Sequence, residues 1–260
     1  MKYSKFYLVS LQFLGFRFSG WQKQQNSKTL HEMVDKSLSY TLGHFDFKTL
    51  GMGRTDAKVS ANRYYFELFL NEEINLNDFL DVFNENLSPD FKALSIKKVS
   101  SDFNILDAPK TKEYHYYFSF SEKAHPFCAP FLISMQENLD IALMQKGAKV
   151  FEGEHYFHKY CTKPSEHTVL KRTIATCEIV ENTILQANFF PEKTYVLKVK
   201  GKGFLRYQIR LMMAALFELG KGNLTLGYIK ESLSENNDGL PLKTIAPASG
   251  LQLFAVEFDI

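Results

Sequence analysis

The sequence predicts an α+β protein made of two α/β subdomains with largely antiparallel sheets and helices on one face. Segments with the period-two alternation of strands alternate with segments of helical period along both halves of the chain. Consecutive strand segments are expected to be mostly neighbours in the sheets, which favours antiparallel pairing. With 260 residues, 45% of them hydrophobic, the chain is long enough to bury a core in one large domain or two ordinary ones.

The first subdomain, residues 1–108, is expected to run strand, helix, strand, strand, helix, strand. Its first helix is indicated by the capping-box spacing of Thr29 and Glu32 and ends at Gly43. A second helix is expected with Asn77 as its N-terminal cap, and it is expected to end before Ser88-Pro89-Asp90. The expected strands are residues 7–13, 45–50, 64–70 and 93–99.

The second subdomain, residues 109–260, follows a connection at 108–112 that has a proline, two lysines and no bulky side chain. Strands are expected at 114–120, 172–180, 194–200 and 251–258, and helices at 138–150, 204–219 and 227–234. Residues 151–171 show no regular pattern.

Charge and cysteine usage limit the class of protein. The formal net charge is only +2, so any nucleic-acid contact must come from a local basic patch. Three cysteines, Cys128, Cys161 and Cys177, form no C-x-x-C pair, which is typical of a reducing compartment. No segment has the length of a membrane span or the pattern of a signal peptide, so we expect a cytoplasmic protein.

A glycine turn at residues 51–61 is the first candidate for chemistry. Gly51 and Gly53 mark backbone that turns tightly, and Arg54, Thr55 and Asp56 follow at once. Between two strands, such a turn can present Asp56 as a nucleophile or general base that Arg54 keeps ionised. The same residues also suit ordinary surface-turn chemistry.

A second candidate surface is basic. Five cations occur within residues 198–210: Lys198, Lys200, Lys202, Arg206 and Arg210. The lysines alternate along one strand face, and the arginines lie four residues apart on the helix predicted from residue 204. This pattern fits a phosphate-binding track, and it equally fits a solvated sheet edge.

Three aromatic residues have two interpretations each. Trp21, in a loop with Arg17, either anchors the core or lines an RNA groove. Tyr114 and Tyr116 point to the same side of one strand, where they are either core residues or a surface on which a base can stack. A further group, His155, His158, Cys161 and His167, matches no common zinc-finger spacing, so we expect no metal site there.

Six blocks of the sequence, in order, resemble those of the tRNA pseudouridine synthase A family. The glycine turn resembles the signature G-R-T-D-x-G-V-H-A. The other blocks are Gly20-Trp21-Gln22-x-Gln24, Lys112-Glu113-Tyr114-His115-Tyr116, Gly153-Glu154-His155-x-Phe157, Gly203-Phe204-Leu205-x-x-x-x-Arg210 and Ala246-Pro247-Ala248-x-Gly250-Leu251.

The resemblance implies a pseudouridine synthase fold, with the two subdomains flanking a central catalytic cleft. It implies a cofactor-free isomerisation of uridine to pseudouridine at positions 38 to 40 in the anticodon arm of tRNA, carried out by a homodimer. Asp56 would be the nucleophile or base, Arg54 would hold the flipped nucleotide, Tyr114 would stack on the base and Arg210 would pair with Asp56. The expected substrate-binding residues are Arg17, Trp21, Lys58, Tyr116, Lys200, Lys202, Phe204 and Arg206.

The chain also departs from the family pattern. The departures are Lys58 for glycine, Ser60 for histidine, Tyr156 for aspartate, Leu106-Asp107 for Arg-Phe and Arg206 for histidine. Two alternatives therefore stay open within the fold: a synthase that acts on a different RNA, and an RNA-binding protein without activity. A zinc-dependent enzyme using His155, His158 and Cys161 is a third.

Overall fold

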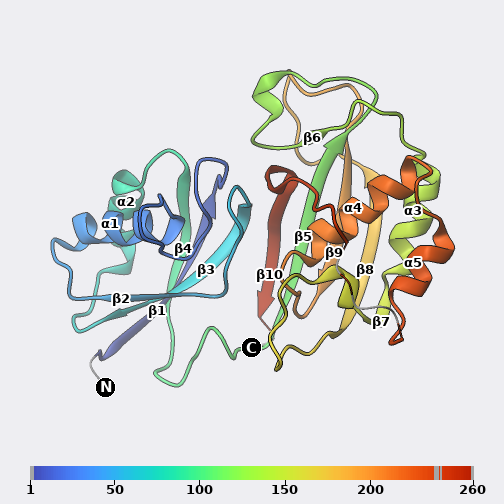
Figure 1. Ribbon diagram of the computed structural model, residues 1–260. Helices are drawn as coiled ribbons and strands as arrows, with labels where there is room; N and C mark the ends of the chain where they lie inside the picture. Colours follow the sequence, from blue (N-terminus) through green and yellow to red (C-terminus); the bar gives the residue numbers. More distant parts are fainter. Residues whose placement is uncertain (1–2, 237–239, 241, 259–260) are drawn as a thin grey trace. The chain divides into compact units, whose positions relative to one another are not determined.

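The computed structural model describes residues 3–236, 240 and 242–258. The chain forms two compact units (Figure 1). The first contains residues 1–110 together with 253–260, and the second contains residues 111–252. The helices among the described residues are all too short or too polar to cross a bilayer.

The first unit follows the order predicted for the first half of the chain. Its elements are β1 (Lys5–Phe13), α1 (Leu30–Leu42), β2 (Lys48–Gly51), β3 (Ser60–Leu70), α2 (Leu76–Asn86) and β4 (Phe91–Lys98). The central strand β1 pairs antiparallel with both β3 and β4, and β2 pairs antiparallel with β3. The last strand, β10 (Leu251–Phe258), follows β3 in the strand order.

The ends of the two helices follow from local side-chain chemistry. Thr29 Oγ1 accepts a hydrogen bond from the backbone N–H of Glu32 at 3.4 Å, and Gly43 ends α1 in the left-handed conformation with φ of 75°, as predicted. The prediction that Asn77 caps the second helix was wrong. Asn75 is the cap, because its side-chain oxygen accepts from the N–H of Asn77 at 3.1 Å.

The strands of the second unit also pair mostly antiparallel. Its elements are β5 (Lys110–Ser119), β6 (Ile133–Ser134), α3 (Ile141–Val150), β7 (Gly153–Tyr156), β8 (Lys171–Glu181), β9 (Tyr195–Gly201), α4 (Gln208–Gly220) and α5 (Leu226–Ser232). The strand order is β5-β9-β8-β7, and the short β6 runs parallel to its neighbour β5. Strand β7 lies in the segment where the sequence shows no regular pattern.

Strand register separates the two faces of this sheet. Tyr114 lies opposite Val199, and Tyr116 lies opposite Leu197, so these four side chains share one face. The helices α3, α4 and α5 of this unit lie beside one another in Figure 1. The ring centroids of Tyr116 and of Phe217 on α4 lie 6.2 Å apart. Helix α4 therefore packs on the sheet face that carries Tyr114 and Tyr116.

The helix predicted from residue 204 begins only at Gln208. Two features delay it. Tyr207 has left-handed backbone with φ of 63°, and the backbone N–H of Leu205 donates to the side-chain oxygen of Gln208 at 2.8 Å. Arg206 therefore precedes the helix, and the prediction that Arg206 and Arg210 share a helical face was wrong.

Candidate active site

Asp56 lies in the loop that joins β2 to β3. The register pairs Gly51 with Phe66, so residues 52–59 close the end of an antiparallel pair. Two hydrogen bonds shape this loop: the Val59 N–H donates to the Asp56 carbonyl at 3.2 Å, and the Tyr64 hydroxyl donates to the Gly53 carbonyl at 2.6 Å. The backbone position of Asp56 is therefore fixed from both sides.

A second loop, residues 15–21, supports the Asp56 loop through its backbone. The Trp21 N–H donates to the Thr55 carbonyl at 3.3 Å, and the Lys58 N–H donates to the Phe18 carbonyl at 3.0 Å. The Gly15 N–H donates to Ser60 Oγ at 3.0 Å. Ser60, which stands where the family has histidine, thus joins the two loops.

The approach of these loops is so close that it requires glycine. A Cβ built at Gly20 would lie 2.4 Å from the Thr55 carbonyl oxygen, and Gly20 has a φ of +90°. At Gly15 the Cβ would lie 1.9 Å from the Val59 carbonyl oxygen. Both contacts are with backbone atoms of the Asp56 loop, so a side chain at either position would displace that loop.

Of the two N-terminal residues predicted to bind substrate, Trp21 is buried and Arg17 is exposed. Trp21 is 2% exposed and stacks on His31, with 5.2 Å between the ring centroids and an interplanar angle of 13°. Its centroid lies 4.2 Å from that of Tyr64, so Trp21 supports the loop from behind as a core residue. Arg17 forms an ion pair with the buried Asp90, and its Nε donates to Oδ1 of that carboxylate at 3.2 Å.

Lys58 occupies the position at which the family pattern has glycine. Its backbone is left-handed, with φ of 68°. This conformation explains the glycine of the pattern, because an L side chain is strained there. The exposed ammonium lies 5.8 Å from the centroid of the Phe16 ring.

Replacing Lys58 with glycine should stabilise the fold. We expect the free energy of unfolding to rise by about 1 kcal/mol, since the left-handed strain is removed. Urea denaturation measures this change. Lys58→Ala is the matched control, because it removes the charge and keeps the strained backbone, and it should change stability by less than about 0.5 kcal/mol. Equal stabilisation by both variants would contradict the backbone explanation.

In the second unit, Tyr114 and Phe204 are brought together. Their ring centroids lie 5.2 Å apart at an angle of 86°, an edge-to-face contact. Tyr116, two residues along β5, is fully buried and its hydroxyl donates to the Pro247 carbonyl at 2.8 Å. Burial raises the pKa of Tyr116 well above its usual value. Tyr116 thus packs beneath the site, whereas Tyr114 is only half-buried.

Arg210 lies in the first turn of α4 and is held in several ways. Its Nε donates to the Ala246 carbonyl at 2.8 Å, and the Ala246 N–H donates back to the Arg210 carbonyl at 3.2 Å. Its guanidinium carbon lies 4.9 Å from the centroid of the Tyr207 ring. The charge of Arg210 also opposes the rise in the pKa of Tyr116.

Lys198 and Lys200 lie on the opposite face of the β5–β9 pair from Tyr114 and Tyr116. Lys200 is opposite Glu113 in the register, and Lys198 is opposite His115, so both lysines share the face that Tyr114 does not use. Lys202 is exposed beyond the end of β9. Lys198 and Lys200 therefore belong to a surface separate from that of Tyr114.

The histidine group near β7 is used within the protein. His155 Nε2 is 2.8 Å from the Glu152 carbonyl oxygen. The His158 ring stacks on the Tyr156 ring, with 5.7 Å between the two ring centroids. Within residues 3–236, 240 and 242–258, no three His, Cys, Asp or Glu side chains are arranged to hold a metal ion.

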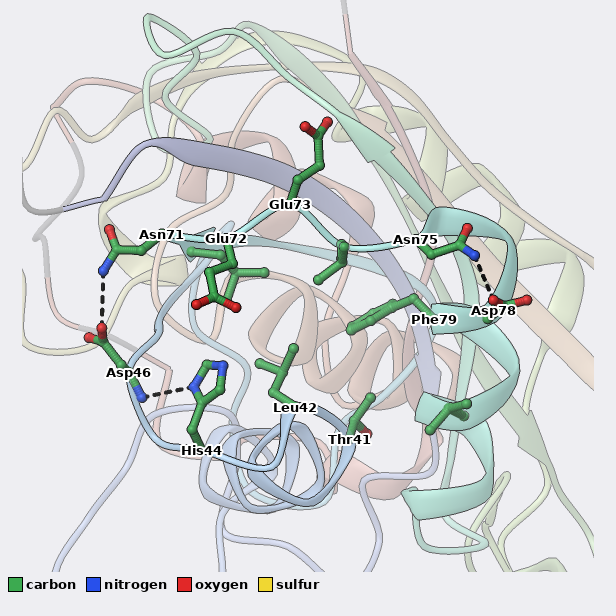
Figure 2. A pocket seen from close by; sticks show the side chains of 13 residues that line it. Thr41, Leu42, His44, Asp46, Asn71, Glu72, Glu73, Asn75, Asp78 and Phe79 are labelled. Carbon is green, nitrogen blue, oxygen red and sulfur yellow. Dashed lines mark hydrogen bonds between the residues drawn. The ribbon is translucent and has the colours of Figure 1, made fainter.

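A cavity of about 530 Å³ in the first unit lies at the other end of β2 and β3 from Asp56 (Figure 2). It is formed by the end of α1, the end of β3 and the start of α2. Carboxylates of Asp46, Glu72, Glu73 and Asp78 line it. Their negative charge opposes phosphate binding, so this cavity does not belong to an RNA site.

The predicted site residues divide between the units. Arg54, Asp56 and Lys58 belong to the first unit, and Tyr114, Phe204, Arg206 and Arg210 belong to the second. Sequence reasoning overlooked Tyr207, whose position between two arginines in R-Y-x-x-R is the pattern that could have revealed it. It also gave no role to Gly15 or to Gly20, although Gly20 opens the block Gly20-Trp21-Gln22-x-Gln24.

Comparisons with known proteins agree with this arrangement of motifs. A family model described as tRNA pseudouridine synthase matches residues 148–259. The chain is 30% identical to a tRNA pseudouridine synthase A of Exiguobacterium sibiricum, over 95% of this chain and 94% of the relative. It is 28% identical to the tRNA pseudouridine synthase A 1 of Desulfotalea psychrophila, over 95% and 96%, and 28% identical to a tRNA pseudouridine synthase A 2 of Bacillus cereus, over 97% and 99%.

Among solved structures, an archaeal box H/ACA sRNP Nop10–Cbf5 complex shows a distant likeness, with a TM-score of 0.36 and 15% identity over 82% of this chain and 44% of that one. The assignment rests instead on the curated relatives, which match over nearly their full length. They confirm the resemblance carried by the six sequence blocks: this chain belongs to the tRNA pseudouridine synthase A family.

Proposed function

We propose that this protein isomerises uridine to pseudouridine in the anticodon arm of tRNA, with Asp56 as the catalytic carboxylate. The observation that carries the proposal is the Asp56 loop. Its residues Gly53 to Asp56 keep the family signature, and hydrogen bonds from Trp21, Tyr64 and Val59 fix its backbone. A reactive carboxylate needs this kind of preorganised support.

The reaction rearranges the atoms of one nucleotide and needs no second substrate. The bond between uracil N1 and ribose C1′ breaks, the uracil turns, and a bond forms between C5 and C1′. The proton on C5 is lost and N1 gains one, so the atoms balance. Asp56 serves either as the nucleophile at C1′ or as the base that forms a glycal, and both routes require it to be ionised.

The other site residues have complementary roles. Arg54 is exposed on the loop, where it can hold the nucleotide out of its stack. Tyr114, braced edge-to-face by Phe204, presents a ring to the base. Arg210 pairs with Asp56 and keeps it ionised as the closing base removes water. The catalytic aspartate of this proposal belongs to the first unit, and the tyrosine and arginine belong to the second.

RNA binding in this proposal relies on exposed cations. Four predicted substrate-binding cations are exposed, and each can contact a phosphate: Arg17, Lys58, Lys202 and Arg206. Because the net charge is only +2, a homodimer that presents two basic patches to one tRNA would strengthen the attraction.

The test uses purified protein and transcribed tRNAs. Each tRNA carries a single uridine in the anticodon arm, at position 38, 39 or 40, and pseudouridine is mapped by mass spectrometry after digestion. We expect modification at one or more of these positions and none in a matched tRNA with cytidine there. Modification outside the anticodon arm would overturn the proposed substrate site. Binding without modification of any tRNA would support the inactive RNA-binding alternative.

A further inference from the structure

Tyr207, immediately before α4, has an unusual backbone. Its φ of 63° and ψ of 8° place it in the left-handed region. Five non-glycine residues among those described have a positive φ: Asn26, Lys58, Ser121, Lys163 and Tyr207. A bulky aromatic residue is the least expected of these, because its side chain gains nothing locally to offset the backbone strain. The benefit must come from where the ring lies.

The ring lies against two arginines. The guanidinium carbon of Arg206 is 5.2 Å from the ring centroid, and that of Arg210 is 4.9 Å from it. Both distances are within the range of cation–π attraction. The π electrons of Tyr207 therefore offset the repulsion between the two positive guanidinium groups. They also favour the position of each guanidinium against the ring.

Arg210 is held by a second contact on a different part of its side chain. Its Nε donates to the Ala246 carbonyl at 2.8 Å. That bond fixes one edge of the guanidinium but still allows the plane to tilt about it. Contact with the Tyr207 ring restrains this tilt, so together the two contacts define both the position and the plane of the guanidinium.

We propose that Tyr207 is a positioning residue, which sets the plane of the Arg210 guanidinium and so the direction in which Arg210 presents its terminal nitrogens for the proposed reaction. This inference rests on the proposed function, in which Arg210 keeps Asp56 ionised. A planar fork binds a carboxylate well only when the two planes are aligned. The strained backbone is thus retained because it delivers the ring, and the Tyr207 hydroxyl is not required.

The test compares Tyr207→Asn with Tyr207→Phe. Asparagine tolerates the left-handed backbone and removes the ring, whereas phenylalanine keeps the ring and the strain. For Asn we expect an unchanged or higher melting temperature, a kcat about 10-fold lower and a KM for tRNA within about 2-fold of wild type. The acid limb of its pH–rate profile should move to higher pH, because Asp56 is held less firmly in its ionised form. Phe should match wild type in kcat and in the acid limb.

A purely structural role would lower the melting temperature and leave the acid limb in place, so that result in the Asn variant would overturn the proposal. Wild-type kcat in Tyr207→Asn would overturn it as well. Should Asn fail to fold, Tyr207→Gly relieves the same strain and carries the same expectations.

Arg210→Met separates this inference from the proposed function. If Arg210→Met works at the wild-type rate, the role of Arg210 fails, and with it the inference. If Arg210→Met is impaired and Tyr207→Asn is not, only the inference fails. In the double variant we expect no loss beyond that of Arg210→Met alone, since Tyr207 acts through Arg210. A further 10-fold loss would show that Tyr207 acts by another route.

Discussion

Asp56→Asn should abolish pseudouridine formation while the affinity for tRNA stays within a few-fold of wild type. The amide keeps the shape of the side chain, but it can act neither as a nucleophile nor as a base. Loss of a reacting group of this kind typically lowers kcat on the order of 10⁴-fold. Binding should persist, because the exposed cations Arg17, Lys58, Lys202 and Arg206 are unchanged.

Single-turnover assays on tRNA measure the chemical step, and filter binding measures affinity. Asp46→Asn is the matched control: it makes the same chemical change at an exposed aspartate at the other end of β2 and β3, and it should keep the wild-type rate. A turnover rate of Asp56→Asn close to that of wild type would show that Asp56 is not the catalytic carboxylate.

Gly20→Ala should also lower the rate strongly, although less than Asp56→Asn, because Gly20 carries no reactive group but contacts the Asp56 loop. The added Cβ would lie 2.4 Å from the Thr55 carbonyl oxygen and 3.1 Å from the Asp56 carbonyl carbon. Neither backbone atom can yield unless the Asp56 loop moves. Since a displacement of about 1 Å in a catalytic group costs roughly 100-fold, we expect kcat to fall about that much. Strain at φ of +90° and overpacking should together lower stability by about 3 kcal/mol.

Gly43→Ala controls for the backbone strain alone. Gly43 has φ of +75° and no atom within 4 Å of an added Cβ. We therefore expect a loss of about 1 kcal/mol in stability and an unchanged kcat. Urea denaturation and single-turnover kinetics on both variants make the comparison. Equal losses of stability, or wild-type kcat in Gly20→Ala, would show that the contact between the two loops is not needed.

Much of the fold was predictable because its signals are local. Thr29 caps α1 through a hydrogen bond to a residue three positions away, and Gly43 ends the same helix by its own backbone preference. The element order of the first half follows from such patterns, and it was confirmed. The family assignment, too, came from short blocks in fixed order, because each block keeps the residue types that the reaction and its tight turns require.

What only the tertiary structure decided depends on contacts between distant segments. Gly20 must be glycine because Thr55 approaches it, and Arg210 is fixed because Ala246 supplies a carbonyl. Local helical period favoured a start at residue 204, but left-handed Tyr207 and the Gln208 side chain delay the helix. Lys200 is turned away from the face of Tyr114 by strand register. Periodicity reports which residues share a face of one element, whereas the packing of other elements decides what that face meets.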